Sequence, residues 1–261
     1  MKPFYWYYHK LVLEVLDKVE GNKMQIKIDE HVFQVGMREN QIECMILFGS
    51  YVNKEHDEKS DIDLVIIVDE CTREELRERR RKIAEEMGVP SRWLMMYTKS
   101  YFKKRAYKGG LFYQGLKAYG RIIYQRSHYI NHVFQKMPKE TNNIGEMYQS
   151  RRRVTETLHA YKKGKIPLER IMAVVAFQIR NVCMHICNQH GKLEVRKYEP
   201  VRACLNYPEL EMPFTLGEFQ ILYQLKREYM NNPRVFRLPL EFEGYVMEWI
   251  RRYMLLINQR I

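Results

Sequence analysis

Short apolar runs alternate with charged segments over the first half of the chain. The runs Glu43 to Phe48 and Ile62 to Val68 are apolar and rich in β-branched residues, which predicts two neighbouring buried strands. Thr72 to Met87 predicts a charged amphipathic helix, with Thr72 as N-cap and Glu75 at the capping-box position. The other predicted elements are a helix over Leu11 to Val19, an alternating segment Met24 to Ile28, a short helix Glu30 to Asn40, a strand Trp93 to Tyr97, a helix Leu111 to Ala118 and a strand Arg121 to Tyr124.

The second half of the chain has the longer periodicity of helices. Apolar residues recur at helical spacing over Ile144 to Lys163, Pro167 to His190, Leu216 to Met230 and Leu240 to Asn258. Three prolines make Gly191 to Pro213 an irregular connection. We therefore predict an α/β (α+β) domain over residues 1–137 and an all-α helical bundle over residues 138–261.

Composition and charge narrow the classes of partner. Lysine and arginine exceed aspartate and glutamate by 12, which favours polyanions such as nucleotides or RNA. The first ten residues do not resemble a signal peptide, and no apolar run approaches the roughly 20 residues that cross a bilayer. The five cysteines are scattered and odd in number, as in reducing compartments. We expect a cytoplasmic protein without a membrane partner.

The loop between the two central strands carries candidate chemistry. Gly49 and Ser50 follow the first strand directly, where a glycine lets the backbone approach a ligand and helix N–H groups can face a phosphate. Asp61 and Asp63 flank Ile62 at the second strand, so their carboxylates project from one face. Mg²⁺ prefers oxygen ligands and is usually held by one or two carboxylates together with substrate phosphates. This spacing predicts a phosphate and magnesium site.

The stretch LFGSYVNKEHDEKSDIDLVII, from Leu47 to Ile67, resembles the minimal nucleotidyltransferase branch of the DNA polymerase beta-like superfamily. The similarity extends over about residues 42 to 126 and implies a nucleotidyltransferase domain with a small mixed sheet. The resemblance implies that Gly49, Ser50 and Ser60 bind the nucleotide, and that Asp61 and Asp63 are the catalytic, metal-binding carboxylates of a one- or two-metal site. It also implies transfer of a nucleotidyl group from a triphosphate to a hydroxyl of a small molecule, protein or RNA. ATP is the default donor, and AMP the default group, by abundance only.

One family position differs in this sequence. The family carries a third carboxylate on its third strand, and the alignment puts Trp93 there. No aspartate or glutamate lies between Glu86 and Glu140. Whether the domain transfers nucleotide or only binds it therefore stays open at the level of the sequence.

Polar residues interrupt the apolar helix predicted over Pro167 to His190. Asn181 and His185 lie four residues apart on one face, and Arg180 lies on a flank. This Arg-Asn-x3-His pattern is similar to that of HEPN domains, helical bundles whose members with this motif are metal-independent ribonucleases with sites formed across a homodimer. The resemblance implies a second candidate site and an alternative function, in which a toxin–antitoxin-like ribonuclease carries a degenerate, nucleotide-sensing transferase domain. The alternative is that these are core or interface residues whose polar groups are already hydrogen-bonded.

Overall fold

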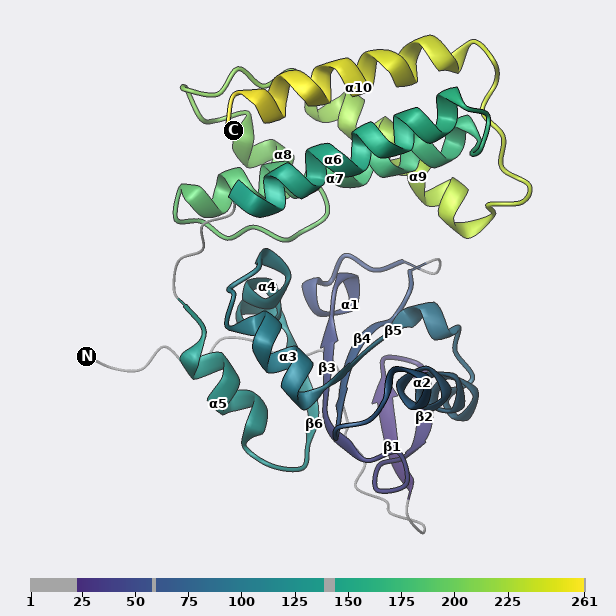
Figure 1. Cartoon of the computed structure of the whole chain (residues 1–261), viewed down its shortest axis with the longest axis vertical. Coiled ribbons are helices and arrows are strands. Elements are labelled where there is room, and N and C mark those ends of the chain that lie inside the picture. Colours follow the sequence, from purple (N-terminus) through teal and green to yellow (C-terminus); the bar gives the residue numbers. More distant parts are fainter. Residues whose placement is uncertain (1–22, 58–59, 139–143, 261) are drawn as a thin grey trace. The chain divides into compact units, whose positions relative to one another are not determined.

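The computed structural model describes residues 23–57, 60–138 and 144–260 of the chain, which divide into two compact units (Figure 1). Unit 1 comprises residues 1–139 and unit 2 residues 140–261. Unit 1 contains a small mixed sheet with helices, and unit 2 is helical. The predicted fold class is therefore confirmed. The helix predicted over Leu11 to Val19 lies outside the described residues.

The sheet of unit 1 has the strand order β5-β4-β3-β6. Its strands are β3 (Ile42–Phe48), β4 (Asp63–Val68), β5 (Leu94–Thr98) and β6 (Arg121–Gln125). β3 pairs antiparallel with both β4 and β6, whereas β4 and β5 are parallel. The central strands β3 and β4 are buried almost throughout, which is why their sequences are continuous apolar runs rather than alternating ones.

Each face of this sheet is covered by its own apolar layer, and Figure 1 shows helices on both sides of the sheet. One layer packs against α2 (Arg73–Met87) and the hairpin of β1 (Lys23–Ile28) and β2 (His31–Gly36). The other packs against α3 (Lys99–Ala106), α4 (Leu111–Tyr119) and α5 (Tyr129–Lys136). The predicted capping box of α2 is present, because Thr72 accepts from the backbone of Glu75 and Glu75 bonds back to Thr72.

Unit 2 is built around one apolar helix, α7 (Leu168–Gln189). The helices α6 (Ile144–Lys162), α9 (Leu216–Asn231) and α10 (Phe242–Asn258) pack against it, and the short α8 (Glu199–Cys204) joins them. By length and composition α7 could cross a membrane, but 72% of its most apolar window is buried inside unit 2. This burial is that of a core helix.

Three local predictions are wrong. The short helix predicted over Glu30 to Asn40 is instead the strand β2, whose partner β1 supplies the hydrogen bonds that a short isolated helix lacks. Trp93 does not lie in a strand, because Ser91–Trp93 forms a 3₁₀ turn before β5. The connection predicted to be irregular contains the short helix α8. Pro200 lies in the first turn of this helix, a position that tolerates proline.

A buried carboxylate fixes the end of the sheet that lies away from Gly49. Glu43 on β3 is 1% exposed and accepts hydrogen bonds from Lys99 Nζ at 3.2 Å, from Arg126 at 2.9 Å and from the Ser127 hydroxyl. Burial raises the pKa of Glu43, but these hydrogen bonds outweigh it and leave the pKa below its ordinary value. The cluster joins β3 to α3 and to the segment after β6.

Replacing Glu43 with glutamine should lower the free energy of unfolding of unit 1 by roughly 2 to 3 kcal/mol, because three hydrogen-bond donors lose a buried anion as their shared acceptor. Denaturant unfolding followed by fluorescence would measure this. The folded pKa is lowered, so the contribution of the carboxylate is present above the ordinary pKa of 4.5 and is lost as the pH falls through the folded value. The difference between the two proteins should therefore shrink in acid. Equal stability of Glu43→Gln and the exposed control Glu30→Gln at pH 7 would contradict this.

Candidate functional site

A tight turn at the end of β3 requires glycine. Gly49 has φ 75° and ψ −148°, a backbone conformation that residues with a Cβ rarely adopt. A Cβ at this position would come closer than 3.0 Å to Oδ2 of Asp63. Ser50 then begins the single-turn helix α1 (Ser50–Asn53), whose start no side chain caps. The turn thus brings bare backbone against a carboxylate.

Asp61 and Asp63 lie where β4 begins, at the same end of the sheet as Gly49. Phe48, the last residue of β3, pairs with Asp63 in the antiparallel register. Ile62 and Leu64 are each 1% exposed, so the alternation predicted for this segment is confirmed. The Asp61 side chain is 46% exposed and Asp63 is half-buried. The structure therefore brings the predicted phosphate turn and one predicted metal ligand, Asp63, into direct proximity, with Asp61 two residues away.

Ser60 has a local partner. Its hydroxyl donates to Oδ1 of Asp57 at 3.0 Å and accepts from the backbone N–H of Asp57 at 2.9 Å. The backbone N–H of Ser60 also donates to the Asp57 carbonyl. These contacts close a turn immediately before Asp61. The nucleotide-binding role of Ser60 stays a prediction.

A cation lies beside Asp61 at this corner. The parallel register of β4 and β5 begins at the pair Leu64 and Leu94, and Trp93 directly precedes this pair as the last residue of the 3₁₀ turn. Trp93 packs into the layer shared with α2, and its indole nitrogen is buried with no hydrogen-bond partner among the described residues. Arg92 instead lies 3.8 Å from Oδ1 of Asp61. Sequence reasoning missed Arg92, although its place beside Trp93 at the start of the strand was a usable signal.

The donor set of this corner fits a magnesium ion that is shared with a substrate. Within the described part of the chain, no group of three His, Cys, Asp or Glu side chains is placed to hold a metal. Two carboxylates, Asp61 and Asp63, are the number that proteins usually contribute to Mg²⁺, which fills its other positions with water and substrate phosphates. Asp61 and Asp63 are therefore the residues that could hold the ion.

The predicted residues of the second site are separated within one chain. The guanidinium of Arg180 donates to the backbone carbonyls of Val195 and Arg196. His185 is 4% exposed, and its Nε2 lies 3.5 Å from a carboxylate oxygen of Glu146 on α6. Arg180 therefore holds a loop while His185 faces another helix. Asn181, which follows Arg180 in the sequence, is half-buried.

Burial makes His185 a source of acid sensitivity. Desolvation lowers its pKa to about 4, although the nearby Glu146 would favour the protonated ring. The unfolded chain therefore binds a proton below pH 6.5 that the folded chain does not. The free energy of unfolding decreases as the pH is lowered from 6.5 to 4. The limiting slope is about 1.4 kcal/mol per pH unit.

We expect His185→Gln to flatten the pH dependence of unit 2 unfolding over this interval. Denaturant unfolding at pH 7, 6 and 5, followed by helical circular dichroism, would show the smaller slope. His159→Gln, at an exposed position on α6, is the matched control and should keep the wild-type slope. If both variants behave like the wild type, His185 is not the responsible group.

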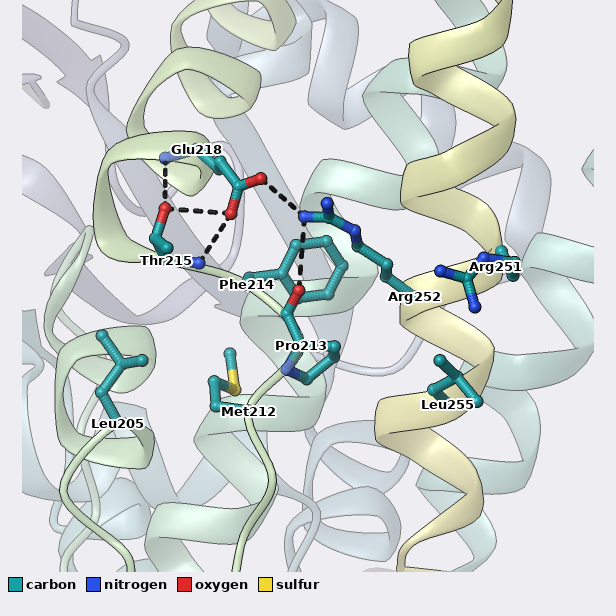
Figure 2. A pocket seen from close by; sticks show the side chains of 9 residues that line it. All are labelled: Leu205, Met212, Pro213, Phe214, Thr215, Glu218, Arg251, Arg252 and Leu255. Atoms are coloured by element: carbon teal, nitrogen blue, oxygen red, sulfur yellow. Dashed lines mark hydrogen bonds and ion pairs between the residues drawn. The ribbon is translucent and has the colours of Figure 1, made fainter.

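Unit 2 also has a depression with a volume of about 510 Å³, and Figure 2 shows the side chains that line it. Its polar rim is internally paired: Glu218 completes the capping box of Thr215 and accepts from Arg252 at 2.6 Å, and Arg252 also contacts the Pro213 carbonyl. None of the predicted site residues lines it. Its lining consists of Leu205, Met212, Pro213, Phe214, Thr215, Glu218, Arg251, Arg252 and Leu255.

Comparisons with known proteins bear on unit 1. A solved structure titled "Crystal structure of the toxin-antitoxin with AMP-PNP" is 16% identical over 50% of this chain and 93% of its own, with a TM-score of 0.29, too low to support an argument. No curated protein matches the chain. Residues 30–127 match the family model described as "Polymerase beta, Nucleotidyltransferase", a segment that contains Gly49, Asp61 and Asp63. Residues 30–127 therefore form a nucleotidyltransferase domain of the polymerase beta type.

Proposed function

We propose that unit 1 binds a nucleoside triphosphate together with Mg²⁺ and transfers its nucleotidyl group to a hydroxyl acceptor. The observation that carries this proposal is the close approach of the Gly49 backbone to Asp63, which puts a phosphate-binding turn and a metal ligand side by side. The match of residues 30–127 to the nucleotidyltransferase family supports the same reaction class.

The proposed roles follow from the chemistry of each group. The backbone at Gly49 and the Ser50 hydroxyl donate to the β- and γ-phosphates, and Asp61 and Asp63 hold the magnesium. Bound magnesium supplies charge neutralisation at the phosphates and orients them. The acceptor oxygen forms a bond to the α-phosphorus, the bond to the bridging oxygen breaks, and pyrophosphate leaves. The hydroxyl proton passes to solvent.

Arg92 sets this corner apart from a site with three carboxylates. Its guanidinium offsets the charge of Asp61 and adds a cation where the triphosphate would lie. The described residues place no third carboxylate with Asp61 and Asp63, so less help is available to deprotonate the acceptor. We therefore propose that unit 1 binds the triphosphate tightly but transfers its nucleotidyl group slowly. ATP is the default donor because it is the most abundant triphosphate.

The test measures binding and transfer separately. Thermal unfolding is followed with and without Mg²⁺ and each of the four nucleoside triphosphates, and transfer is followed with donors labelled at the α-phosphate. A triphosphate at 100 times its Kd should stabilise unit 1 by about 2.7 kcal/mol, and EDTA should remove the effect. A shift without labelled product would reduce the proposal to nucleotide binding. The absence of any shift would overturn it.

The structure gives less support to a ribonuclease at Arg180 and His185. Within one chain these side chains contact different segments, and His185 is buried, whereas a proton-transferring histidine must reach its substrate. A site completed by a second copy of the chain stays a prediction. RNA cleavage that persists in EDTA and is lost in His185→Ala would establish it.

A further inference from the structure

Lysine side chains and aromatic rings alternate on one surface of unit 2. Phe177 comes from α7, Lys197 and Tyr198 from the segment that leads into α8, and Tyr223 and Lys226 from α9. We call these five residues the lysine–aromatic surface. None of them belongs to the sites predicted from sequence, because each lies in a different local pattern and only the fold gathers them.

The Tyr223 ring is at the centre of this surface. Lys226 Nζ lies 4.5 Å from its centroid and Lys197 Nζ lies 5.7 Å from it. The same two ammonium groups reach outward, to Phe177 at 5.9 Å and to Tyr198 at 4.9 Å. Cations and ring faces thus alternate continuously from α7 to α8.

Buried contacts hold the rings in place. Phe219, which is fully buried, packs edge-on against Tyr198 at 6.3 Å and lies 5.7 Å from Tyr223 between ring centroids. Arg180 holds the carbonyls of the two residues that precede Lys197. The rings are therefore fixed before any ligand binds, which lowers the entropic cost of binding.

The surface is partly open to solvent. Phe177 is 41% exposed, whereas Tyr198 and Tyr223 are half-buried. The two acids nearest in sequence to Lys197 are paired with arginines: Glu199 with Arg202 at 2.9 Å and Glu194 with Arg196 at 2.7 Å. Among the described residues, the contacts of the Lys226 ammonium group are with rings and not with carboxylates.

We propose that the lysine–aromatic surface binds single-stranded nucleic acid. Unpaired bases stack on aromatic faces, cations neutralise the phosphates between them, and the chain carries a net charge of +12. Partly exposed rings favour this ligand over an acidic peptide, which has no flat groups to stack, and over a duplex, whose bases are already stacked. The proposal does not depend on nucleotide transfer by unit 1.

The test is fluorescence anisotropy of the full chain with labelled single-stranded RNA and DNA of about 16 nucleotides, at several salt concentrations. Lys197→Gln/Lys226→Gln should reduce the slope of log Kd against log salt by roughly 1.4, at 0.7 for each phosphate contact to a single strand. Tyr198→Leu/Tyr223→Leu keeps apolar packing but removes the stacking faces, and it should weaken binding at least about tenfold with little change in slope.

The matched controls are Lys163→Gln and Tyr245→Leu, which alter exposed residues elsewhere on unit 2 and should bind as the wild type does. Circular dichroism melts show that each variant is folded. The ratio of the Kd values for RNA and DNA shows which of the two nucleic acids the surface prefers. Equal affinity for duplex DNA or for polyglutamate, or wild-type binding by both double variants, would overturn the proposal.

Discussion

Asp61→Asn and Asp63→Asn should each abolish detectable nucleotidyl transfer while unit 1 stays folded. Asparagine keeps the shape of the side chain but removes the negative charge that holds magnesium. Loss of a residue that merely orients a metal ligand costs about 10- to 100-fold, so loss of a ligand itself should cost at least about a hundredfold. Transfer of label from an α-labelled triphosphate measures the effect, and a titration with Mg²⁺ shows whether affinity for the metal has fallen.

Asp57→Asn is the matched control for this pair. Asp57 is an exposed acid in the same loop, and asparagine can retain the turn that it makes with Ser60. Its activity should stay close to that of the wild type. Full transfer by the Asp61 or Asp63 variant would remove the metal site from the proposal, even if nucleotide still bound.

Gly49→Ala should remove nucleotide binding and also destabilise unit 1. The methyl group would force alanine into a conformation that costs about 1 to 3 kcal/mol and would displace the Asp63 carboxylate. Denaturant unfolding measures the first effect and calorimetric titration with a triphosphate and Mg²⁺ measures the second. The added Cβ atom causes the loss of stability and the loss of binding, because the Gly49 backbone lies directly against the Asp63 carboxylate.

Gly88→Ala separates these two causes. Gly88 ends α2 with φ 64°, and a Cβ there would meet nothing within 4 Å. This variant should lose roughly 1 kcal/mol of stability from backbone strain and keep nucleotide binding. If Gly49→Ala loses no more stability than Gly88→Ala and binds nucleotide normally, the close approach to Asp63 has no functional meaning.

The parts of the fold that the sequence predicts well are those in which local and tertiary forces agree. β4 combines β-branched residues with burial on both faces, and α2 carries its own cap, so neither needs distant information. The segment from Glu30 to Asn40 is different. It contains the strand β2 because β1 pairs with it from Lys23↔Gly36 to Ile28↔His31. The apolar pattern of a short segment does not show that such a partner strand is present.

The candidate site divides in the same way. Gly49, Asp61 and Asp63 were predicted because the chain brings them to adjacent strand ends within a short loop. Arg92 was not, because it reaches Asp61 from the 3₁₀ turn before β5, and the parallel pairing of β4 with β5 brings that turn to the start of β4. The side chains of Arg180 and His185 share a helix but contact different neighbours, which spacing along one helix cannot show.

Strand β4 ties its chemistry to its alignment. Its side chains alternate between the two apolar layers, with Asp63 at the open end of the row that Val65 and Ile67 continue. A shift of one residue against β3 would turn that row over, burying a charge beneath α2 and exposing leucine in its place. A misaligned chain would therefore be both unstable and inactive. The position of Asp63 at this corner and the register between β3 and β4 therefore depend on each other.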